Sequence, residues 1–319
     1  MTWGWLWRRL VSLGIVLLAV ALATYVLLDL MPGSTASAIL GPGATPEAIA
    51  IVEHDLQLDR PLPVRFGVWL GRAALGDLGV SYRTGEIVTV SLRERVPVSI
   101  ELLVLTQVVA VTLAGAAALL SARRENGRLD RTLSAISFGA IALPQFALGI
   151  VLLVVFAQKL GWFPVAEFAR LTDDVGANLR SMVLPVATLA LPLAGIYYRV
   201  LRTDLLQTLR SDHITFARAM GLSPRRVLIG RALRPSSLTL ISVVGLNTAF
   251  LLGGAVIVER LFSVPGLGQQ LTASVATRDV VMVQGTALVI AAVYVVINLA
   301  VDVALTLIDP RSRLARSAT

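Results

Sequence analysis

Cysteine is absent from this chain of 319 residues, and histidine occurs only at His54 and His213. The lack of cysteine excludes disulfide bonds, thiolate metal sites and cysteine nucleophiles. Two histidines so far apart in sequence do not predict a metal site. Lysine is equally scarce, because Lys159 is the only one and lies in no Gly-x-x-x-x-Gly-Lys-Ser/Thr phosphate loop. We therefore expect no catalytic residue, no metal and no cofactor on this chain, and no ATP site of its own.

Charged residues are also few. They make up 15% of the chain, compared with about 25% in an ordinary soluble domain. Hydrophobic residues make up 56%. Such a chain has too little polar surface to cover a water-soluble globule, so the lipid bilayer is its expected solvent.

Long apolar runs replace the missing charge. A membrane-spanning helix needs about 20 mainly apolar residues. About six segments qualify, which predicts an all-α membrane protein with spans near residues 10–30, 98–120, 133–156, 182–200, 238–258 and 280–308. The first segment could instead be a signal peptide, with Arg8 and Arg9 before it and Ala36-Ser37-Ala38 as a cleavage site. Its apolar run exceeds the usual 7–15 residues of a signal peptide, which favours a retained helix.

Arginine carries most of the net charge of +8. Nucleic-acid binding is not expected, because the arginines lie in short segments between apolar runs, as topology signals do. Their distribution places both termini in the cytoplasm. The predicted organisation starts with an N-terminal transmembrane helix (1–30) and an extracytoplasmic loop (31–97). A core transmembrane domain (98–308) follows, with one large cytoplasmic loop (204–236), and a cytoplasmic tail (309–319) ends the chain.

The extracytoplasmic loop is too long to be a simple connector. It begins with helix-breaking pairs such as Pro32-Gly33, and residues 45–58 then have helical character. Thr45 is a plausible N-cap, with Pro46 at the first helical position. This loop is either a lid that packs on the membrane domain or a docking surface for an external partner.

The most informative cytoplasmic segment runs from Ser211 to Arg226. Ser211 or Asp212 can cap a helix of about two turns, and Gly221 can end it in the left-handed region. Ser223 then caps a second helix, with Pro224 at its first position. The small residues at 217, 219 and 221 would let a protein partner approach closely, and residues 216 and 220 share a face. An amphipathic helix resting on lipid headgroups fits the same spacing.

Several motifs together resemble the first permease subunit of dipeptide, oligopeptide and nickel ABC importers. The likeness covers nearly the whole chain, through Leu58-Asp59-Arg60-Pro61-Leu62-Pro63-Val64-Arg65, Gly76-Asp77-Leu78-Gly79-Val80-Ser81, Thr215 to Leu222, Gly253-Gly254-Ala255-Val256-Ile257-Val258-Glu259, Phe262-Ser263-Val264-Pro265-Gly266-Leu267-Gly268 and Asp309-Pro310-Arg311. Two positions depart from the family pattern. Thr215 and Phe216 stand where the general importer signature has glutamate and alanine, and an expected proline near Arg234 appears at Pro235.

The resemblance implies a type I ABC importer permease fold in the bacterial cytoplasmic (inner) membrane. It also implies that a short coupling helix docks on the ATPase, here through Asp212, Thr215, Phe216, Ala217, Arg218, Ala219, Met220 and Gly221. Implied partners are a second homologous permease, two ATP-binding cassette subunits that bind ATP and Mg²⁺, and an extracytoplasmic solute-binding protein. The implied function is peptide import by alternating access, with nickel or another solute as alternatives.

Residues within the spans bear on other classes of function and on helix packing. Ion-coupled secondary transport would use ionisable groups in the membrane, and only Glu101 and Asp302 are candidates. An intramembrane enzyme lacks a catalytic constellation. The polar residues Gln107, Asn247 and Asn298 either join helices or line a pathway. Gly245, Gly253 and Gly254 allow helices to pack closely, or mark a moving gate.

Overall fold

The computed structural model describes residues 3–30, 40, 43–55 and 60–308. The Ala36-Ser37-Ala38 segment, the Leu58-Asp59 pair and the predicted tail at 309–319 lie outside these residues. The chain forms two compact units, Met1–Ser99 with Pro265–Val296 and Ile100–Val264 with Ile297–Thr319. Helices dominate both, and the described residues include one isolated β-bridge, between Val80 and Ile87.

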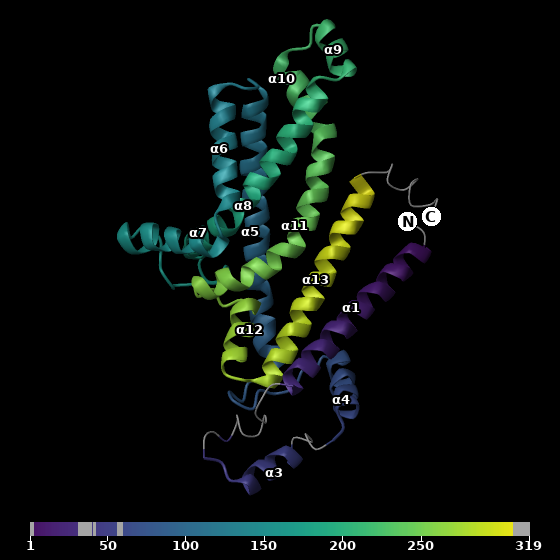
Figure 1. Ribbon diagram of the computed structural model, residues 1–319, viewed down its shortest axis with the longest axis vertical. Coiled ribbons are helices and arrows are strands. Elements are labelled where there is room, and N and C mark those ends of the chain that lie inside the picture. The colour runs from purple at the N-terminus through teal and green to yellow at the C-terminus, as the bar shows by residue number, and fades with distance from the viewer. Residues whose placement is uncertain (1–2, 31–39, 41–42, 56–59, 309–319) are drawn as a thin grey trace. The chain divides into compact units, whose positions relative to one another are not determined.

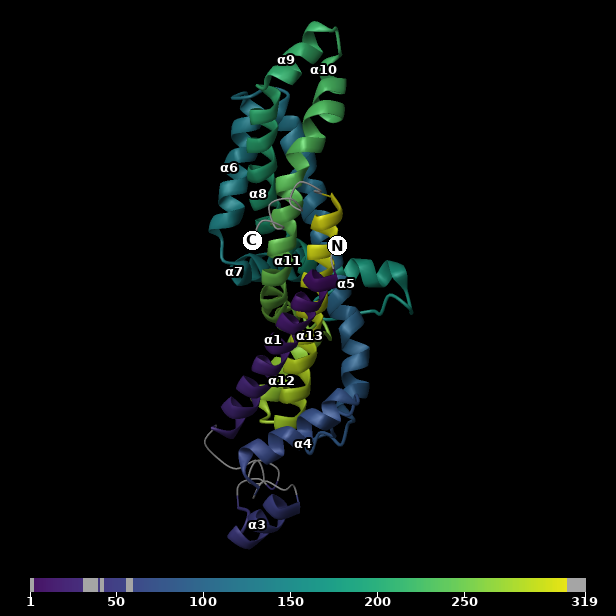
Figure 2. The same cartoon turned by 90° about the vertical axis from the view of Figure 1, so that its right-hand side faces the viewer.

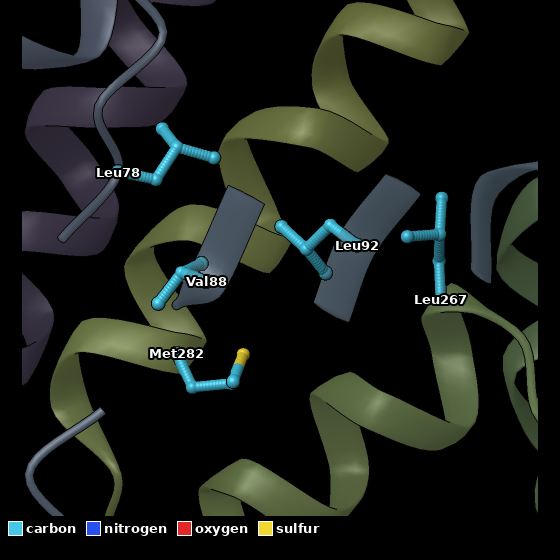
Figure 3. Close-up of a cluster of buried hydrophobic side chains, with 5 residues drawn as sticks. All are labelled: Leu78, Val88, Leu92, Leu267 and Met282. Carbon is cyan, nitrogen blue, oxygen red and sulfur yellow. The ribbon is translucent and has the colours of Figure 1, made fainter. Parts of the chain in front are cut away.

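The first unit combines two stretches that are far apart in the sequence. It contains α1 (Trp3–Asp29), α3 (Pro46–Asp55), α4 (Leu62–Ala74), the start of α5 (Val88–Ala122), α12 (Leu267–Ala276) and most of α13 (Val280–Ile308). Its buried cluster consists of Leu78, Val88, Leu92, Leu267 and Met282 (Figure 3). Because these residues come from distant parts of the sequence, the cluster joins the outer loop to α5, α12 and α13.

Two helices, α3 and α4, lie in the predicted outer loop. The helical character predicted for 45–58 is confirmed over Pro46–Asp55, which is α3, while residues 56–58 lie outside the described residues. The Ala48 amide donates to Thr45 Oγ1 at 3.3 Å, and Pro46 is the first helical residue. The sequence did not predict α4. Its Phe66 and Trp69 pack against Tyr25 of α1, with ring centroids 5.5 and 6.0 Å from the Tyr25 ring. This contact places a helix of the predicted loop directly on the first predicted span.

The second unit is a bundle with a projecting end (Figure 1). It contains the rest of α5, then α6 (Arg128–Ala142), α7 (Gln145–Leu152), π-helix η1 (Leu153–Lys159), α8 (Val175–Leu209), α9 (Asp212–Ala219), α10 (Pro224–Arg226), π-helix η2 (Val227–Ala232), α11 (Leu233–Leu261) and the end of α13. Helix α8 is central, because α6, α7 and α11 all pack on it. Gly195 permits a close crossing, since a Cβ there would lie 2.9 Å from the Ser137 carbonyl oxygen of α6.

Five described helices are long and apolar enough to cross a membrane, or six if α6 with α7 and η1 forms one broken span. The prediction of about six spans is thus met only with that broken span. A continuous third helix over 133–156 is wrong, because the chain bends by 104° between α6 and the α7–η1 pair. Leu143 adopts an extended conformation (φ −80°, ψ 127°) before Pro144. A residue that precedes proline is pushed out of the helical region, which explains the break.

Two other spans are longer than predicted. Helix α5 begins at Val88 rather than near Val98 and includes Pro97 in its interior. Helix α8 has 35 residues, whereas about 20 suffice for the hydrocarbon layer. At about 1.5 Å per residue, α8 is about 50 Å long. It is therefore longer than the hydrocarbon layer is thick, and it carries α9 at its end, as both views show (Figures 1 and 2).

Candidate functional site

The short helix α9 is the candidate docking element, and its C-terminal end forms as predicted. Gly221 has φ +79°, in the left-handed region that glycine adopts without a steric penalty. The Gly221 amide donates to the Arg218 carbonyl at 2.9 Å, and the Leu222 amide donates to the Ala217 carbonyl at 3.3 Å. These two bonds form a Schellman motif, which satisfies the last carbonyls of the helix. The prediction for Gly221 is confirmed.

The N-terminal end of α9 differs from the prediction. Ser211 occupies the N-cap position, but its side chain makes no capping bond. Its hydroxyl instead donates to the Thr208 carbonyl at 2.5 Å and lies 2.9 Å from Nδ1 of His213. Asp212 is the first helical residue rather than the cap. At the next turn Ser223 and Pro224 hold the predicted positions, again without a side-chain cap.

The two faces of α9 are clearly distinct. Ile214 is fully buried and Ala217 is 8% exposed, so this face packs on the chain itself. Phe216 and Met220 are 67% and 70% exposed, which confirms the shared exposed face that their spacing predicts. The remaining candidates of the docking set are exposed too: Asp212, Thr215, Arg218, Ala219 and Gly221.

Burial of Ala217 corrects one prediction. We expected the small side chains at 217 and 219 to form one surface open to a partner. Because Ala217 faces the chain, it cannot offer close approach to another protein, and only Ala219 remains exposed. The exposed surface is therefore an aromatic ring and a thioether beside one alanine. Large exposed apolar side chains that lie together mark an interaction surface.

Helix α9 packs on the end of α8 and on the π-helix η2. Val227 and Leu228 of η2 are buried, and the hydroxyls of Thr208 and Ser236 lie 3.0 Å apart across the same junction. A single π-helical turn inside a longer helix frequently marks a functional site. Here η2 lies between α10 and α11 and packs against α9.

A buried charged cluster lies near the same end of the unit. The Arg202 guanidinium of α8 binds both carboxylate oxygens of Asp130 at the start of α6, with Nε–Oδ1 2.6 Å and Nη2–Oδ2 2.7 Å. The Asn126 amide also donates to Oδ2 at 2.9 Å, and the hydroxyls of Ser121 and Tyr198 complete the shell. We call these five residues the Asp130 cluster. A two-pronged contact of this kind fixes both position and orientation.

A second ion pair joins the same loop to the base of α9. Arg210 Nη2 lies 2.6 Å from Glu125 Oε1, and Glu125 directly precedes Asn126 of the Asp130 cluster. The loop between α5 and α6 is thus held to α8 at two points, one buried and one exposed. Sequence reasoning missed this arrangement. Its only signal was an aspartate among the arginines that follow α5, and nothing in the sequence pairs it with Arg202.

The predicted polar positions within the spans separate into two groups. Tyr197 donates to Gln107 Oε1 at 3.0 Å, and Gln107 Nε2 donates to Thr248 Oγ1 at 2.8 Å. We call these three residues the Gln107 cluster, which joins α5, α8 and α11. Asn247 instead donates to the Val243 carbonyl of its own helix at 2.9 Å. Gln107 therefore connects helices, whereas half-buried Asn247 and Asn298 remain candidates for the pathway.

The predicted glycines differ in whether neighbouring atoms leave room for a side chain. A Cβ on Gly254 would lie 2.7 Å from Gln145 Oε1 of α7, and one on Gly245 would overlap Val301 of α13. Both are therefore packing positions. Gly253 is exposed, and a Cβ there would meet nothing within 4 Å. A role for Gly253 in a pathway or an interface stays a prediction.

The groups considered for ion coupling do not gather. Glu101 on α5 and Asp302 on α13 are each half-buried. Within the described residues, no group of three or more histidine, cysteine, aspartate or glutamate side chains could hold a metal ion.

The chain is similar to known proteins over most of its length. Residues 112–314 match the family model described as "Binding-protein-dependent transport system inner membrane component". Residues 2–103 match the model for the N-terminal part of such membrane components. Together the two matches include nearly all of both structural units.

Curated relatives of similar length also match. A probable peptide ABC transporter permease of Sinorhizobium fredii is 36% identical over 306 residues, covering 96% of this chain and 98% of the relative. The dipeptide transport system permease of Alkalihalophilus pseudofirmus is 33% identical, with 95% and 97% covered. The glutathione transport system permease of Escherichia coli is 33% identical, with 96% and 97% covered.

A solved structure shows a similar fold. The crystal structure of an amino acid ABC transporter with histidines aligns with a TM-score of 0.52 at 16% identity. The alignment covers 70% of this chain and 94% of that one. This similarity bears on the fold alone.

Proposed function

Because the chain belongs to the family of binding-protein-dependent transport system inner membrane components, we propose that it forms half of a translocation pathway that imports peptides. The chain is a multi-pass membrane permease subunit of an ABC importer. The expected type I importer fold is confirmed by the helical architecture and by the similar solved structure.

Peptides are the proposed cargo because of what the relatives are named for. The three relatives carry the names of peptide, dipeptide and glutathione permeases, and each matches this chain over nearly its whole length. Glutathione is itself a short peptide, so the three names share one chemistry. Nickel or another solute remains the alternative cargo. Membership of the ABC permease family argues against ion-coupled secondary transport.

The proposed assembly contains a second, homologous permease, two ATPase subunits and a solute-binding protein. ATP and Mg²⁺ would bind to the ATPase subunits. In this arrangement both termini and the segment 204–236 face the cytoplasm, while the loop at 31–97 faces outward as a lid or a docking surface. The arginine distribution supports this orientation.

The observation that carries the proposal is the two-faced character of α9. Its buried face, at Ile214 and Ala217, holds it on the chain, and its exposed face presents Phe216 and Met220. A rigid helix with exposed apolar anchors fits a groove on a partner. Closure of the ATPase subunits on ATP would move α9. The paired contacts around Asp130 and Arg210 would then carry that movement to α5, α6 and α8.

Bulk on the exposed face tests the docking role. The Ala219→Trp variant should insert normally but bind its ATPase at least about tenfold more weakly, because the indole separates the two surfaces. Co-purification of the ATPase subunits from solubilised membranes measures this. Ala74→Trp is the matched control, since Ala74 is also exposed and is the last residue of its helix, α4.

The same variant separates docking from a helix that rests on lipid. Tryptophan is favoured at the membrane interface, so a headgroup-bound α9 would tolerate Ala219→Trp. Undiminished ATPase recovery and peptide uptake in this variant would exclude α9 as the docking helix. Uptake by the chain without ATPase subunits, driven by an ion gradient, would contradict the proposed function as a whole.

A further inference from the structure

A pocket of about 630 Å³ lies beside α9, within the second unit, and Arg218 is the residue of α9 that lines it. It is formed where the end of α5, the end of α8, α9, α10 and η2 meet. We call it the arginine pocket, and its lining residues are Leu119, Ala122, Arg123, Leu209, Arg218, Pro224, Arg225, Val227, Leu228 and Ile229. Its volume lies in the range typical of small-molecule sites, about 300–1,000 Å³.

Most of the wall is apolar. Leu119 and Ala122 contribute the α5 side, and Val227, Leu228 and Ile229 contribute the η2 side. Ile229 is 45% exposed, although it is a large hydrophobic residue. A wall of this composition is unfavourable for bound water and favourable for a hydrocarbon chain.

The charged residues of the lining are three arginines, and the lining contains no carboxylate. Across the part of the chain that the structure describes, Arg123, Arg218 and Arg225 have no ion pair and no side-chain hydrogen bond. Nearby Arg202 and Arg210 are both paired with carboxylates. The pocket thus concentrates unpaired positive charge, for which no acidic side chain of the lining compensates.

Apolar walls with unpaired guanidinium groups match an amphiphilic anion. Guanidinium groups bind phosphate oxygens in a planar, two-pronged geometry. Basic pockets between membrane helices near the cytoplasmic surface bind the head groups of anionic lipids. We propose that the arginine pocket binds one anionic phospholipid, with its phosphate among Arg123, Arg218 and Arg225 and an acyl chain along Leu119 and Ile229.

A lipid bound in this pocket would connect several elements of the second unit. Arg123 follows α5, Arg218 lies on α9 and Arg225 lies on α10, so one phosphate would join three elements. The bound lipid would hold α9 against the end of α5. This role extends the proposed function, but the binding itself depends only on the pocket and on the presence of a membrane.

Lipid binding to the purified chain tests the proposal. Native mass spectrometry of the detergent-solubilised chain should show retained phosphatidylglycerol in preference to phosphatidylcholine with the same acyl chains. The Arg123→Gln, Arg225→Gln double variant should bind phosphatidylglycerol about thirtyfold more weakly, since each lost arginine near a membrane surface costs about fivefold. Arg231→Gln with Arg234→Gln is the matched control. These arginines are exposed and close in sequence but lie outside the pocket lining.

Two further experiments distinguish binding in the pocket from non-specific electrostatic attraction of the lipid to arginines. Ala122→Leu keeps every arginine and fills part of the wall, so it should also weaken retention of phosphatidylglycerol. Inorganic phosphate at millimolar concentration should not displace the lipid, because it lacks the acyl chain.

Three outcomes would overturn the proposal. The first is equal retention of the two lipids by the wild-type chain. The second is an equal loss in the control variant. The third is normal lipid binding by the double variant together with lost ATPase recovery, which would assign these arginines to a protein partner. None of these outcomes bears on whether Ala219→Trp disrupts docking, so the proposed function is judged separately.

Discussion

The Asp130 cluster and the Gln107 cluster both join helices of the second unit, yet one is charged and the other is neutral. Asp130 and Arg202 form a two-pronged ion pair at the α5–α6 turn, where Arg202 keeps 24% of its side chain exposed. Gln107, Tyr197 and Thr248 lie within the spans and exchange only neutral hydrogen bonds. Burying a hydrogen-bonded pair of neutral groups away from water costs little free energy. Burying a charge costs much more unless the charge has a partner and keeps some contact with water.

The net contribution of an ion pair to stability differs from the stability lost when one partner is removed. A buried ion pair gains Coulomb energy but has lost hydration, so its net contribution to stability is small. Removing one partner is different, because the other charge stays behind unpaired. The charged cluster should therefore tolerate loss of both partners better than loss of one, whereas the neutral cluster should respond weakly to either change.

The largest expected effect is that of Asp130→Asn. It leaves the Arg202 guanidinium without its counter-ion, and breaking a buried pair in this way costs about 3–5 kcal/mol of the free energy of unfolding. The exposed fraction of Arg202 places the expected value at the lower end of that range. Thermal unfolding of the purified chain in detergent measures the change.

The double variant Asp130→Asn, Arg202→Gln is the control for this prediction. It removes both charges, so it should recover a large part of the lost stability. If the double variant is no more stable than the single one, the unpaired charge is not the cause of the loss. The distinction between the two clusters would then fail.

A smaller effect is expected for Gln107→Leu. It removes the hydrogen bonds to Tyr197 and Thr248, and hydrogen bonds between membrane helices contribute about 0.6 kcal/mol on average, with a maximum near 1.7. The same unfolding measurement should show a decrease of about 1 kcal/mol. Tyr197→Phe, which removes only one bond, should lose less. A loss as large as that of Asp130→Asn would show that charge does not distinguish the clusters.

The smallest expected effect is that of Glu125→Gln. The pair that it breaks is exposed, with 70% of the Arg210 side chain and 33% of the Glu125 side chain accessible. Exposed ion pairs contribute about 0–1 kcal/mol and are screened by salt. Any difference from the wild-type chain should vanish at about 1 M salt, where the screening length is about 3 Å. A salt-independent loss above 1 kcal/mol would show that Glu125 belongs to the buried cluster.

Local sequence was sufficient wherever the governing contacts lie within a few residues. Thr45 caps α3 through an amide three residues ahead, and α9 ends at Gly221 through bonds from the amides of residues 221 and 222 to the carbonyls of residues 218 and 217. The apolar runs predicted the membrane class because hydrocarbon solvation depends on composition over about 20 residues. The bend at Pro144 was also visible locally, but a window average of hydropathy hides a single proline.

By itself, then, the sequence determined the membrane class, most of the spans and the turn at Gly221, because each depends on neighbouring residues or on composition. Only the tertiary structure decided that Ala217 faces inward, that Arg202 meets Asp130 across 72 positions of sequence, and that three unpaired arginines surround one apolar pocket. Helical periodicity gives the relative angles of residues on a helix but not which side meets a neighbour. That choice is made when helices pack, because burial of one face depends on side chains contributed by distant segments.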